Sequence, residues 1–260
     1  MNVSMHFEKI INYKHLSSFI SLFYFCLMLF IALSYHTIGC YGVETDFFWS
    51  YLPAAKSFLN GKILVDGFRG PLYPIVLGIL SIITKNYFAA GIIISVFSAS
   101  LVLFFTFGIV EKLTNSFFAV LIILFTAVNN HFVHYAYTAG TDMIFNALLS
   151  GAVYFFLKKE LNSFNIAVSG VLSSLALLTR YNGIFLLAII PLIFLFKSFS
   201  YKSRIKAAAV FFIAFIIFQL PWSLYSYNEK GDFFYNKNYL NTALEVYNSG
   251  TVDRENFWFG

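Results

Sequence analysis

Long apolar runs separated by short polar segments dominate this chain. An α-helix needs about 20 apolar residues to cross the hydrocarbon core of a bilayer, and seven runs reach or approach that length. They are 16–36, 87–110, 116–130, 141–157, 163–179, 181–197 and 205–226. An eighth run, 71–84, is shorter and opens with Pro71 and Pro74, so we expect an interfacial or re-entrant helix that does not cross. The pattern predicts an all-α polytopic membrane protein with about seven transmembrane helices and further interfacial helices.

Composition supports the membrane interpretation. The 260 residues are 59% hydrophobic and only 11% charged, and their mean hydropathy is +0.75. Soluble domains carry about 25% charged residues. With less than half of that charge, a chain of this size cannot cover its surface with hydrated groups, so the class of soluble proteins is excluded.

The distribution of charge predicts the orientation. If 71–84 does not cross, the N-terminus and the segments near 111–115, 158–162 and 198–204 share one side, with nine basic and three acidic residues. The other side holds eight basic and nine acidic residues. Lys and Arg favour short cytoplasmic loops, so we expect the N-terminus inside and the C-terminus outside. The formal net charge of +5 therefore follows membrane orientation and does not indicate binding to nucleic acid.

The first apolar run could be mistaken for a signal peptide. It is longer than the 7–15 residues of a typical signal core, and no small-residue cleavage site follows it. We therefore expect a retained transmembrane helix. Cys26 lies inside this run and Cys40 beyond it, which favours neither a disulfide framework nor a metal site.

The predicted spans divide the chain into two parts. Residues 1–226 form a transmembrane module, and 227–260 form an extracytoplasmic tail that we expect to be the start of a further C-terminal region. The outer parts of the module are the long first loop 37–86, a loop near 131–140 and a tight turn at Arg180. Pro221 and Trp222 are predicted to mark the outer end of the last helix, where an interfacial Trp is common.

Candidate chemistry lies at the outer ends of the spans, because their middles are essentially free of ionisable residues. Asp46 lies just beyond the first span. The aromatic-rich segment 47–59 after it can form an amphipathic helix on the membrane surface, which Asn60-Gly61 would end. A carboxylate held there could act as a base toward a substrate carried on a lipid. A transporter would instead place its site near the midplane on broken helices, and the sequence offers little for such a site.

Several short motifs occur in order along the outer side. They are Asp46, Ala54-Ala55 with Asn60-Gly61, Arg69-Gly70-Pro71-Leu72-Tyr73-Pro74, Thr141-Asp142, Leu178-Thr179-Arg180-Tyr181-Asn182-Gly183, and Pro221-Trp222 with Asn228 and Gly231. This layout resembles the GT-C superfamily of glycosyltransferases. The similar branch contains the dolichyl-phosphate-mannose–protein mannosyltransferases, the aminoarabinose transferases of lipid A and the RgtA/B/C/D-like bacterial enzymes.

The resemblance implies a hexosyl or pentosyl transferase in a bacterial cell membrane. It would move a sugar from a polyprenyl-phosphate donor to a lipid, glycan or protein acceptor at the extracytoplasmic face. A single displacement without a covalent intermediate inverts the anomeric carbon and needs one general base, for which we choose Asp46. Arg180 is the best candidate to hold the leaving phosphate, with Arg69 and Lys85 beside it. Asp142 would orient the acceptor or, with Asp46, hold a divalent cation.

The chain departs from the family pattern in two places. Many relatives have two adjacent acids in the first loop, whereas this chain has Glu44-Thr45-Asp46, so Glu44 is a third catalytic candidate. Relatives often continue with more spans after the seventh, whereas this sequence stops at Gly260.

Each candidate also has a simpler interpretation. Asp46 could be a solvated loop acid, Arg180 an anchor that reaches the lipid headgroups, and Asp142 a charge that favours a helix N-terminus. His131 and His134 have a spacing that suits a metal, but interfacial packing is favoured because no third ligand is near. The alternative functions are a polytopic transporter or flippase and an inactive membrane scaffold.

Overall fold

The structure, a computed structural model, describes residues 15–36, 44–158, 162–195 and 199–237. Within these ranges the chain is helical and contains no strand, which confirms the all-α prediction. The helices are α2 (Leu16–Tyr35), η3 (Phe47–Tyr51, a π-helical turn), α3 (Leu52–Leu59), α4 (Leu72–Thr84), α5 (Tyr87–Leu113), α6 (Ser116–Val128), α7 (Asn130–Tyr137), α8 (Asp142–Lys158), α9 (Ser163–Thr179), η4 (Tyr181–Ala188, a 3₁₀ helix), α10 (Ile189–Leu195) and α11 (Tyr201–Lys230).

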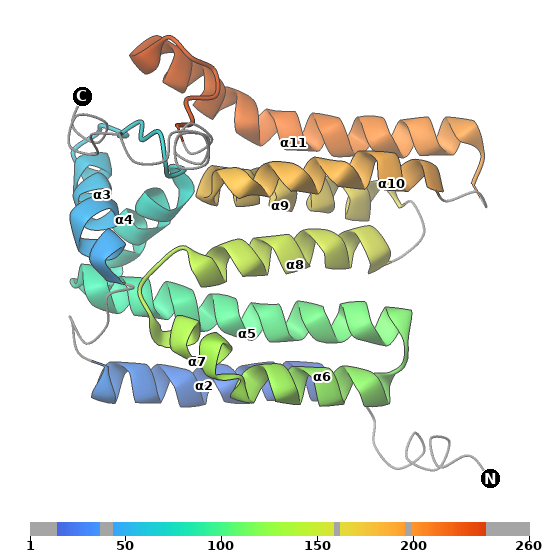
Figure 1. The fold of residues 1–260 in the computed structure, drawn as a ribbon, viewed down its shortest axis with the longest axis horizontal. Coiled ribbons are helices and arrows are strands. Elements are labelled where there is room, and N and C mark those ends of the chain that lie inside the picture. Colours follow the sequence, from blue (N-terminus) through green and yellow to red (C-terminus); the bar gives the residue numbers. More distant parts are fainter. Residues whose placement is uncertain (1–14, 37–43, 159–161, 196–198, 238–260) are drawn as a thin grey trace, which may run out of the picture.

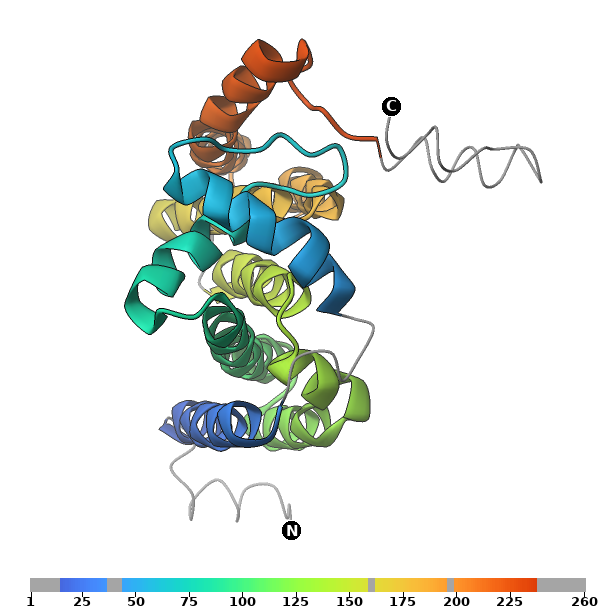
Figure 2. The ribbon, with the colours of Figure 1, turned by 90° about the vertical axis from the view of Figure 1, so that its left-hand side faces the viewer.

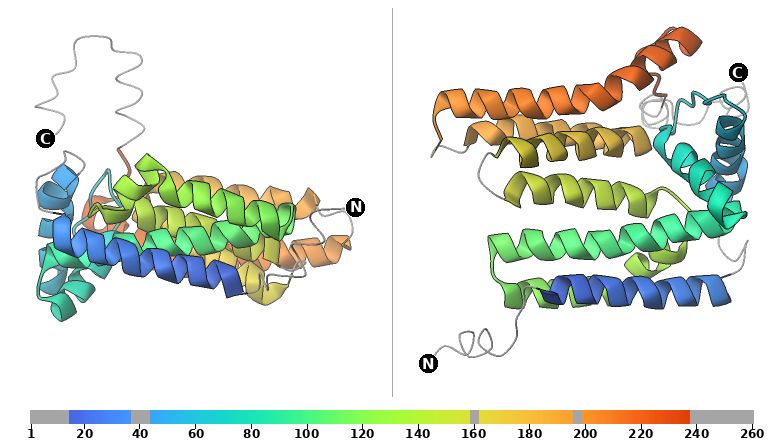
Figure 3. Two further views of the ribbon diagram at one scale, coloured as in Figure 1. Left: turned by 90° about the horizontal axis from the view of Figure 1, so that it is seen from below. Right: turned by 180° about the vertical axis from the view of Figure 1, so that it is seen from behind.

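The long helices lie side by side in one bundle, and successive ones run in opposite directions (Figures 1 and 3). The short helices α3 and α4 cap one end of this bundle, which Figure 2 views end-on. We call this end, with α3, α4 and the segments 60–71 and 138–142, the loop end. The opposite end, where α5 ends and α11 begins, is the basic end. Helix α4 stays at the loop end, as expected for the short run 71–84.

The membrane assignment is supported by helix length and composition. Helices α2, α5 and α11 are long and apolar enough to cross a bilayer, and α6 with α7 would make a fourth, broken span. Helix α9 and the segment Tyr181–Leu195 are apolar but shorter. The seven predicted runs therefore all appear as helical segments of one bundle.

Two of the predicted boundaries were wrong. The run 116–130 was expected to be one span followed by a loop, but α6 ends at Val128 and α7 continues at an angle of 64°. The backbone of Asn129 is extended there, and its side chain accepts a hydrogen bond from the Phe132 N–H (3.1 Å), so it starts a new helix. Helix α11 also continues to Lys230, past the expected end at Trp222, whose side chain is buried. The predicted tail 227–260 thus begins inside α11.

Basic side chains gather at the basic end. They are Lys112 at the end of α5, Lys158 at the end of α8, and Lys202, Arg204 and Lys206 in the first turns of α11. In the described part of the chain, the one acidic residue near them is Glu111, which accepts a hydrogen bond from Ser116 (2.7 Å). The loop end carries both signs of charge. The fold therefore gathers basic residues at one end of its long axis, and the side of the membrane that this end faces stays a prediction.

Small residues let the helices approach closely, as is usual where lipid provides no hydrophobic drive for association. Ser169 in α9 donates a hydrogen bond to the Ala152 carbonyl in α8 (2.8 Å). A Cβ atom added at the next residue, Gly170, would lie 2.4 Å from the Phe211 carbonyl oxygen of α11. Helix α9 thus packs between α8 and α11 through two adjacent small residues, Ser169 and Gly170.

The Gly170→Val variant tests this packing. The added side chain meets backbone rather than a flexible side chain, so we expect destabilisation by about 1–3 kcal/mol or more. The measurement is the temperature at which half of the detergent-solubilised protein loses its monodisperse peak on size-exclusion chromatography. Gly140→Ala is the matched control, because a Cβ there would meet only the Asp142 carboxylate at 3.9 Å. Equal melting of both variants would contradict the proposed contact between α9 and α11.

Candidate active site

Four of the predicted site residues come together at the loop end, each at the boundary of an element. Asp46 lies directly before η3, and Arg69 lies three residues before the start of α4. Asp142 is the first residue of α8, and Arg180 joins α9 to η4. Ends of helices place these charged groups outside the apolar body of the bundle.

Asp46 and Arg69 form the first ion pair. The Arg69 Nη2 donates to Asp46 Oδ1 at 2.8 Å, and its Nη1 donates to Asp66 Oδ2 at 3.3 Å. The Asp46 side chain is 59% exposed and that of Arg69 only 22%. Burial alone would lower the pKa of Arg69, but the carboxylates of Asp46 and Asp66 raise it above its usual value. The guanidinium therefore stays charged, and one face of Asp46 stays open to solvent.

Asp142 and Arg180 form the second ion pair. The Arg180 Nη1 donates to Asp142 Oδ1, and both side chains are partly exposed. The Arg180 guanidinium also lies over the ring of Phe145, 5.9 Å from its centre. An arginine has five N–H donors, so this pairing leaves donors for a further anion.

Tyr51, which the sequence did not single out, connects the two pairs. Arg69 lies over its ring at 5.7 Å, and its hydroxyl group shares a hydrogen bond of 3.3 Å with the hydroxyl of Thr141, the residue before Asp142. Burial raises the pKa of Tyr51, and the hydrogen bond to Thr141 and the positive charges of Arg69 and Arg180 only partly oppose this shift, while Asp46 adds to it, so the phenol stays neutral. The charges of both pairs thus act on one side chain, and the pairs belong to one site.

Close backbone packing brings together the two segments that carry Arg69 and Arg180. A Cβ atom added at Gly70 would lie 2.0 Å from the Leu178 carbonyl oxygen, so only glycine permits this approach. Gly70 follows Arg69, and Leu178 stands two residues before Arg180. The Tyr181 hydroxyl also donates to the Asp66 carbonyl oxygen at 2.8 Å. The segment before α4 is therefore fixed against the end of α9.

Glu44 is buried, in contrast to Asp46 two residues later. Its side chain is 1% exposed, and Oε1 accepts a hydrogen bond from the Ala139 N–H (3.0 Å) and lies 2.8 Å from Nε2 of His36. Its Oε2 atom is buried and has no hydrogen-bond partner among the described residues. Glu44 thus joins the end of α2 to the loop that carries Asp142. Within the same ranges the nearby Tyr73 hydroxyl is also buried without a partner, and burial raises its pKa well above the usual value.

The remaining candidates lie apart from these pairs. Lys85 ends α4 in a left-handed conformation (φ 55°) and is exposed, and in the described part of the chain no ion pair joins it to the site.

His134 contacts Tyr137, while His131 is exposed. No group of three or more His, Cys, Asp or Glu side chains that could hold a metal occurs among the described residues. Cys26 is a free thiol, and Cys40 lies outside the described ranges.

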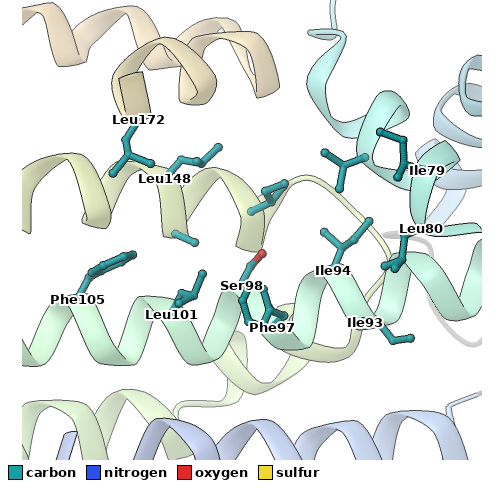
Figure 4. Close-up of a pocket in the computed structure, with 13 residues that line it drawn as sticks. Ile79, Leu80, Ile93, Ile94, Phe97, Ser98, Leu101, Phe105, Leu148 and Leu172 are labelled. Atoms are coloured by element: carbon teal, nitrogen blue, oxygen red, sulfur yellow. The ribbon is translucent and has the colours of Figure 1, made fainter. Parts of the chain in front are cut away.

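Two cavities adjoin the loop end. The polar cavity, of about 520 Å³, is lined by residues of η3 and α3, by the segment Lys62–Gly70 with Pro74, and by Glu229, Lys230, Tyr235 and Lys237. It includes Asp66 and Arg69. The apolar cavity, of about 650 Å³, lies between α4, α5, α8 and α9 (Figure 4). Ser98 supplies the one hydroxyl group among its otherwise hydrocarbon lining residues.

The fold and site define a polytopic membrane protein with paired acidic and basic groups at one end of its helices. The family model described as dolichyl-phosphate-mannose-protein mannosyltransferase matches residues 69–222, and the chain belongs to this family. It is therefore a membrane glycosyltransferase of the GT-C type, which favours the enzyme over the transporter and scaffold alternatives. The match contains Arg69, Asp142 and Arg180 but not Glu44 or Asp46. No curated protein and no solved structure matches the chain.

The contacts of Glu44 predict that it anchors the loop before Asp142. Glu44→Ala leaves the buried Ala139 N–H unsatisfied, which costs about 1–3 kcal/mol and favours opening of this loop. Glu44→Gln keeps an acceptor oxygen. In a background with Cys26→Ser and Cys40→Ser, we expect Gly140→Cys to react with a soluble maleimide about tenfold faster when Glu44 is alanine, and nearly unchanged when it is glutamine. Equal rates in all three backgrounds would show that Glu44 does not hold the loop.

Proposed function

We propose that this enzyme transfers a sugar from a polyprenyl-phosphate donor to an acceptor hydroxyl or amine at the extracytoplasmic face, with inversion of the anomeric carbon. The observation that carries the proposal is the pair of ion pairs at the loop end, Asp46 with Arg69 and Asp142 with Arg180. They supply the two charges that the reaction needs, a carboxylate that can take a proton and guanidinium groups that can hold a phosphate.

Asp46 is the general base of the proposed reaction. Arg69 occupies only its Oδ1 atom, and the side chain is mostly exposed, so Oδ2 can reach an acceptor. The acceptor oxygen or nitrogen attacks the anomeric carbon while its proton passes to Asp46. The bond from that carbon to the phosphate oxygen breaks on the opposite face, and its electron pair leaves with the phosphate. Atoms and charge balance without a covalent enzyme intermediate.

Arg69 and Arg180 are proposed to hold the donor phosphate. Both are permanently charged, and their planar donor groups suit phosphate oxygens. In the present arrangement each faces a carboxylate, so neither charge is left uncompensated before the donor binds. Asp142 then has the role of orienting Arg180, and a divalent cation at Asp46 and Asp142 stays a prediction.

Glu44 has a positioning role in this proposal rather than a chemical one. Its carboxylate is enclosed by protein and contacts Ala139 and His36, so it cannot touch a substrate from solvent. Because it stands two residues before Asp46 and bonds to the loop before Asp142, it sets the distance between the two ion pairs.

The apolar cavity supports a lipid-linked donor (Figure 4). It extends along α5 from Ile93 to Phe105, which is about 18 Å at the rise of an α-helix. At the loop end it is lined by Ile144, two residues after Asp142, and by Val76 of α4. A prenyl chain there would lie in the hydrocarbon layer with its phosphate near the two arginines.

Loss of the base gives the first test of this function. In membranes supplied with radiolabelled polyprenyl-phosphate sugars, Asp46→Asn should lower sugar transfer by about 10²–10⁴-fold, the usual contribution of a general base. Glu111→Gln is the matched control, since it removes a carboxylate at the basic end and should leave transfer unchanged. Transfer that is equal in Asp46→Asn and the natural chain would exclude Asp46 as the base.

Donor length gives a second test. If the apolar cavity holds the prenyl chain, transfer at low donor concentration should rise with each added isoprene unit until the chain fills the cavity, because each buried CH₂ group adds about 0.8 kcal/mol. The measurement is kcat/KM for a series of donors from a single isoprene unit upward, in detergent. Values that are independent of chain length would place the lipid elsewhere.

A further inference from the structure

The polar cavity lies at the loop end, and Arg69 lines it. Three parts of the chain form it: η3 with the start of α3, the segment Lys62–Gly70, and the residues around the end of α11. The Arg69 side chain that lines it is the one that bonds Asp46. A molecule in this cavity would therefore be next to the proposed base.

Hydrogen bonds fix the wall of this cavity. The Tyr225 hydroxyl in α11 donates to the Ile63 carbonyl oxygen (2.9 Å), and the Lys237 N–H donates to the Gly67 carbonyl oxygen (2.7 Å). A Cβ atom added at Gly67 would lie 3.0 Å from the Lys237 side chain. The segment and the residues after α11 are thus packed together, and the cavity is not simply a gap between loops.

Positive charge exceeds negative charge in the lining. Four cations line the cavity, namely Lys62, Arg69, Lys230 and Lys237, against the two acids Asp66 and Glu229. Within the described ranges, Arg69 has carboxylate partners, whereas no carboxylate lies within ion-pair distance of the three lysines. Lys230 and Lys237 instead both lie over the ring of Tyr235, at 5.7 and 5.6 Å. Surface lysines are usually only solvated, but here they converge from separate segments on one cavity.

An aromatic ring completes the lining. Trp49 stands three residues after Asp46, lines the cavity and is 84% exposed. The flat, apolar face of an indole suits the C–H face of a sugar ring, and its N–H can still bond to water or to a hydroxyl group. Tyr51 and Tyr235 add further aromatic surface.

From these features we propose that the polar cavity binds the acceptor, and that this acceptor is a saccharide carrying an acidic group, either a carboxylate or a phosphate. The lysines bind the acidic group, Trp49 packs against a sugar ring, and the reacting hydroxyl points past Arg69 to Asp46. The assignment as the acceptor site rests on the proposed glycosyl transfer, whereas the binding of an acidic saccharide does not.

Binding can be measured without transfer. The 260-residue chain, in nanodiscs of zwitterionic lipid, is titrated with a short oligogalacturonate and with a neutral manno-oligosaccharide of equal length, and tryptophan fluorescence is followed. We expect a response to the acidic saccharide that is lost in Trp49→Phe. The double variant Lys230→Gln/Lys237→Gln should weaken the Kd by about tenfold or more, the scale of losing a charged hydrogen bond. The control Lys112→Gln/Lys202→Gln removes the same charge at the basic end and should bind normally.

Several outcomes would overturn the proposal. These are equal binding of both saccharides, no binding of the acidic one, or an equal loss in the lysine variant and its control. Binding of the protein to phosphatidylglycerol vesicles through Lys230 and Lys237, without saccharide binding, would assign the lysines to the membrane surface.

In transfer assays the lysine variant should raise KM for an acidic acceptor and leave KM for the donor unchanged. If the protein binds the acidic saccharide but transfers no sugar, the binding site in the polar cavity is supported and the proposed function is wrong.

Discussion

The cost of placing charge in hydrocarbon determines where this protein can have chemistry. An ionised side chain at the centre of a bilayer is expensive, so the described helices carry their charged groups at their ends. One end collects lysine and arginine and sets the expected orientation, and the other collects Asp46, Arg69, Asp142 and Arg180. The same constraint that makes the chain a membrane protein therefore brings its reactive groups into a single layer at the loop end.

Within that layer, backbone contacts and one buried carboxylate give the site its geometry. Gly70 permits the segment that carries Arg69 to touch the end of α9, so the two arginines lie at one place. Glu44 fixes the loop before Asp142 against the start of η3. A buried carboxylate with two partners is costly to remove, which makes it suited to hold a site in place. Asp46, by contrast, is mostly exposed, as its proposed role as the base requires.

The sequence predicted the apolar segments, the short helix α4 and the family, because helix length, hydropathy and short motifs are local properties. It did not predict the break at Asn129, since a single extended residue capped by its own side chain leaves the hydropathy pattern intact. Tyr51 and the buried state of Glu44 were also missed, because both depend on partners about 90 or more residues away, Thr141 and Ala139. Pro221 and Trp222 were expected to end the last helix because the apolar run ends near them, whereas the helix continues to Lys230.

In the proposed reaction, the two cavities bind different substrates. The apolar cavity lies among α4, α5, α8 and α9, and in the proposed function it takes the lipid-linked donor, while the polar cavity is lined by segments at the loop end. Arg69 lines the polar cavity, and Ile144, two residues after Asp142, lines the apolar one. A donor phosphate entering from the membrane side would compete with Asp46 for Arg69 and with Asp142 for Arg180, and a carboxylate released from its arginine is a stronger proton acceptor. Donor binding would thereby activate Asp46 when a sugar is present to be transferred, which couples the two substrates through the charge of one arginine.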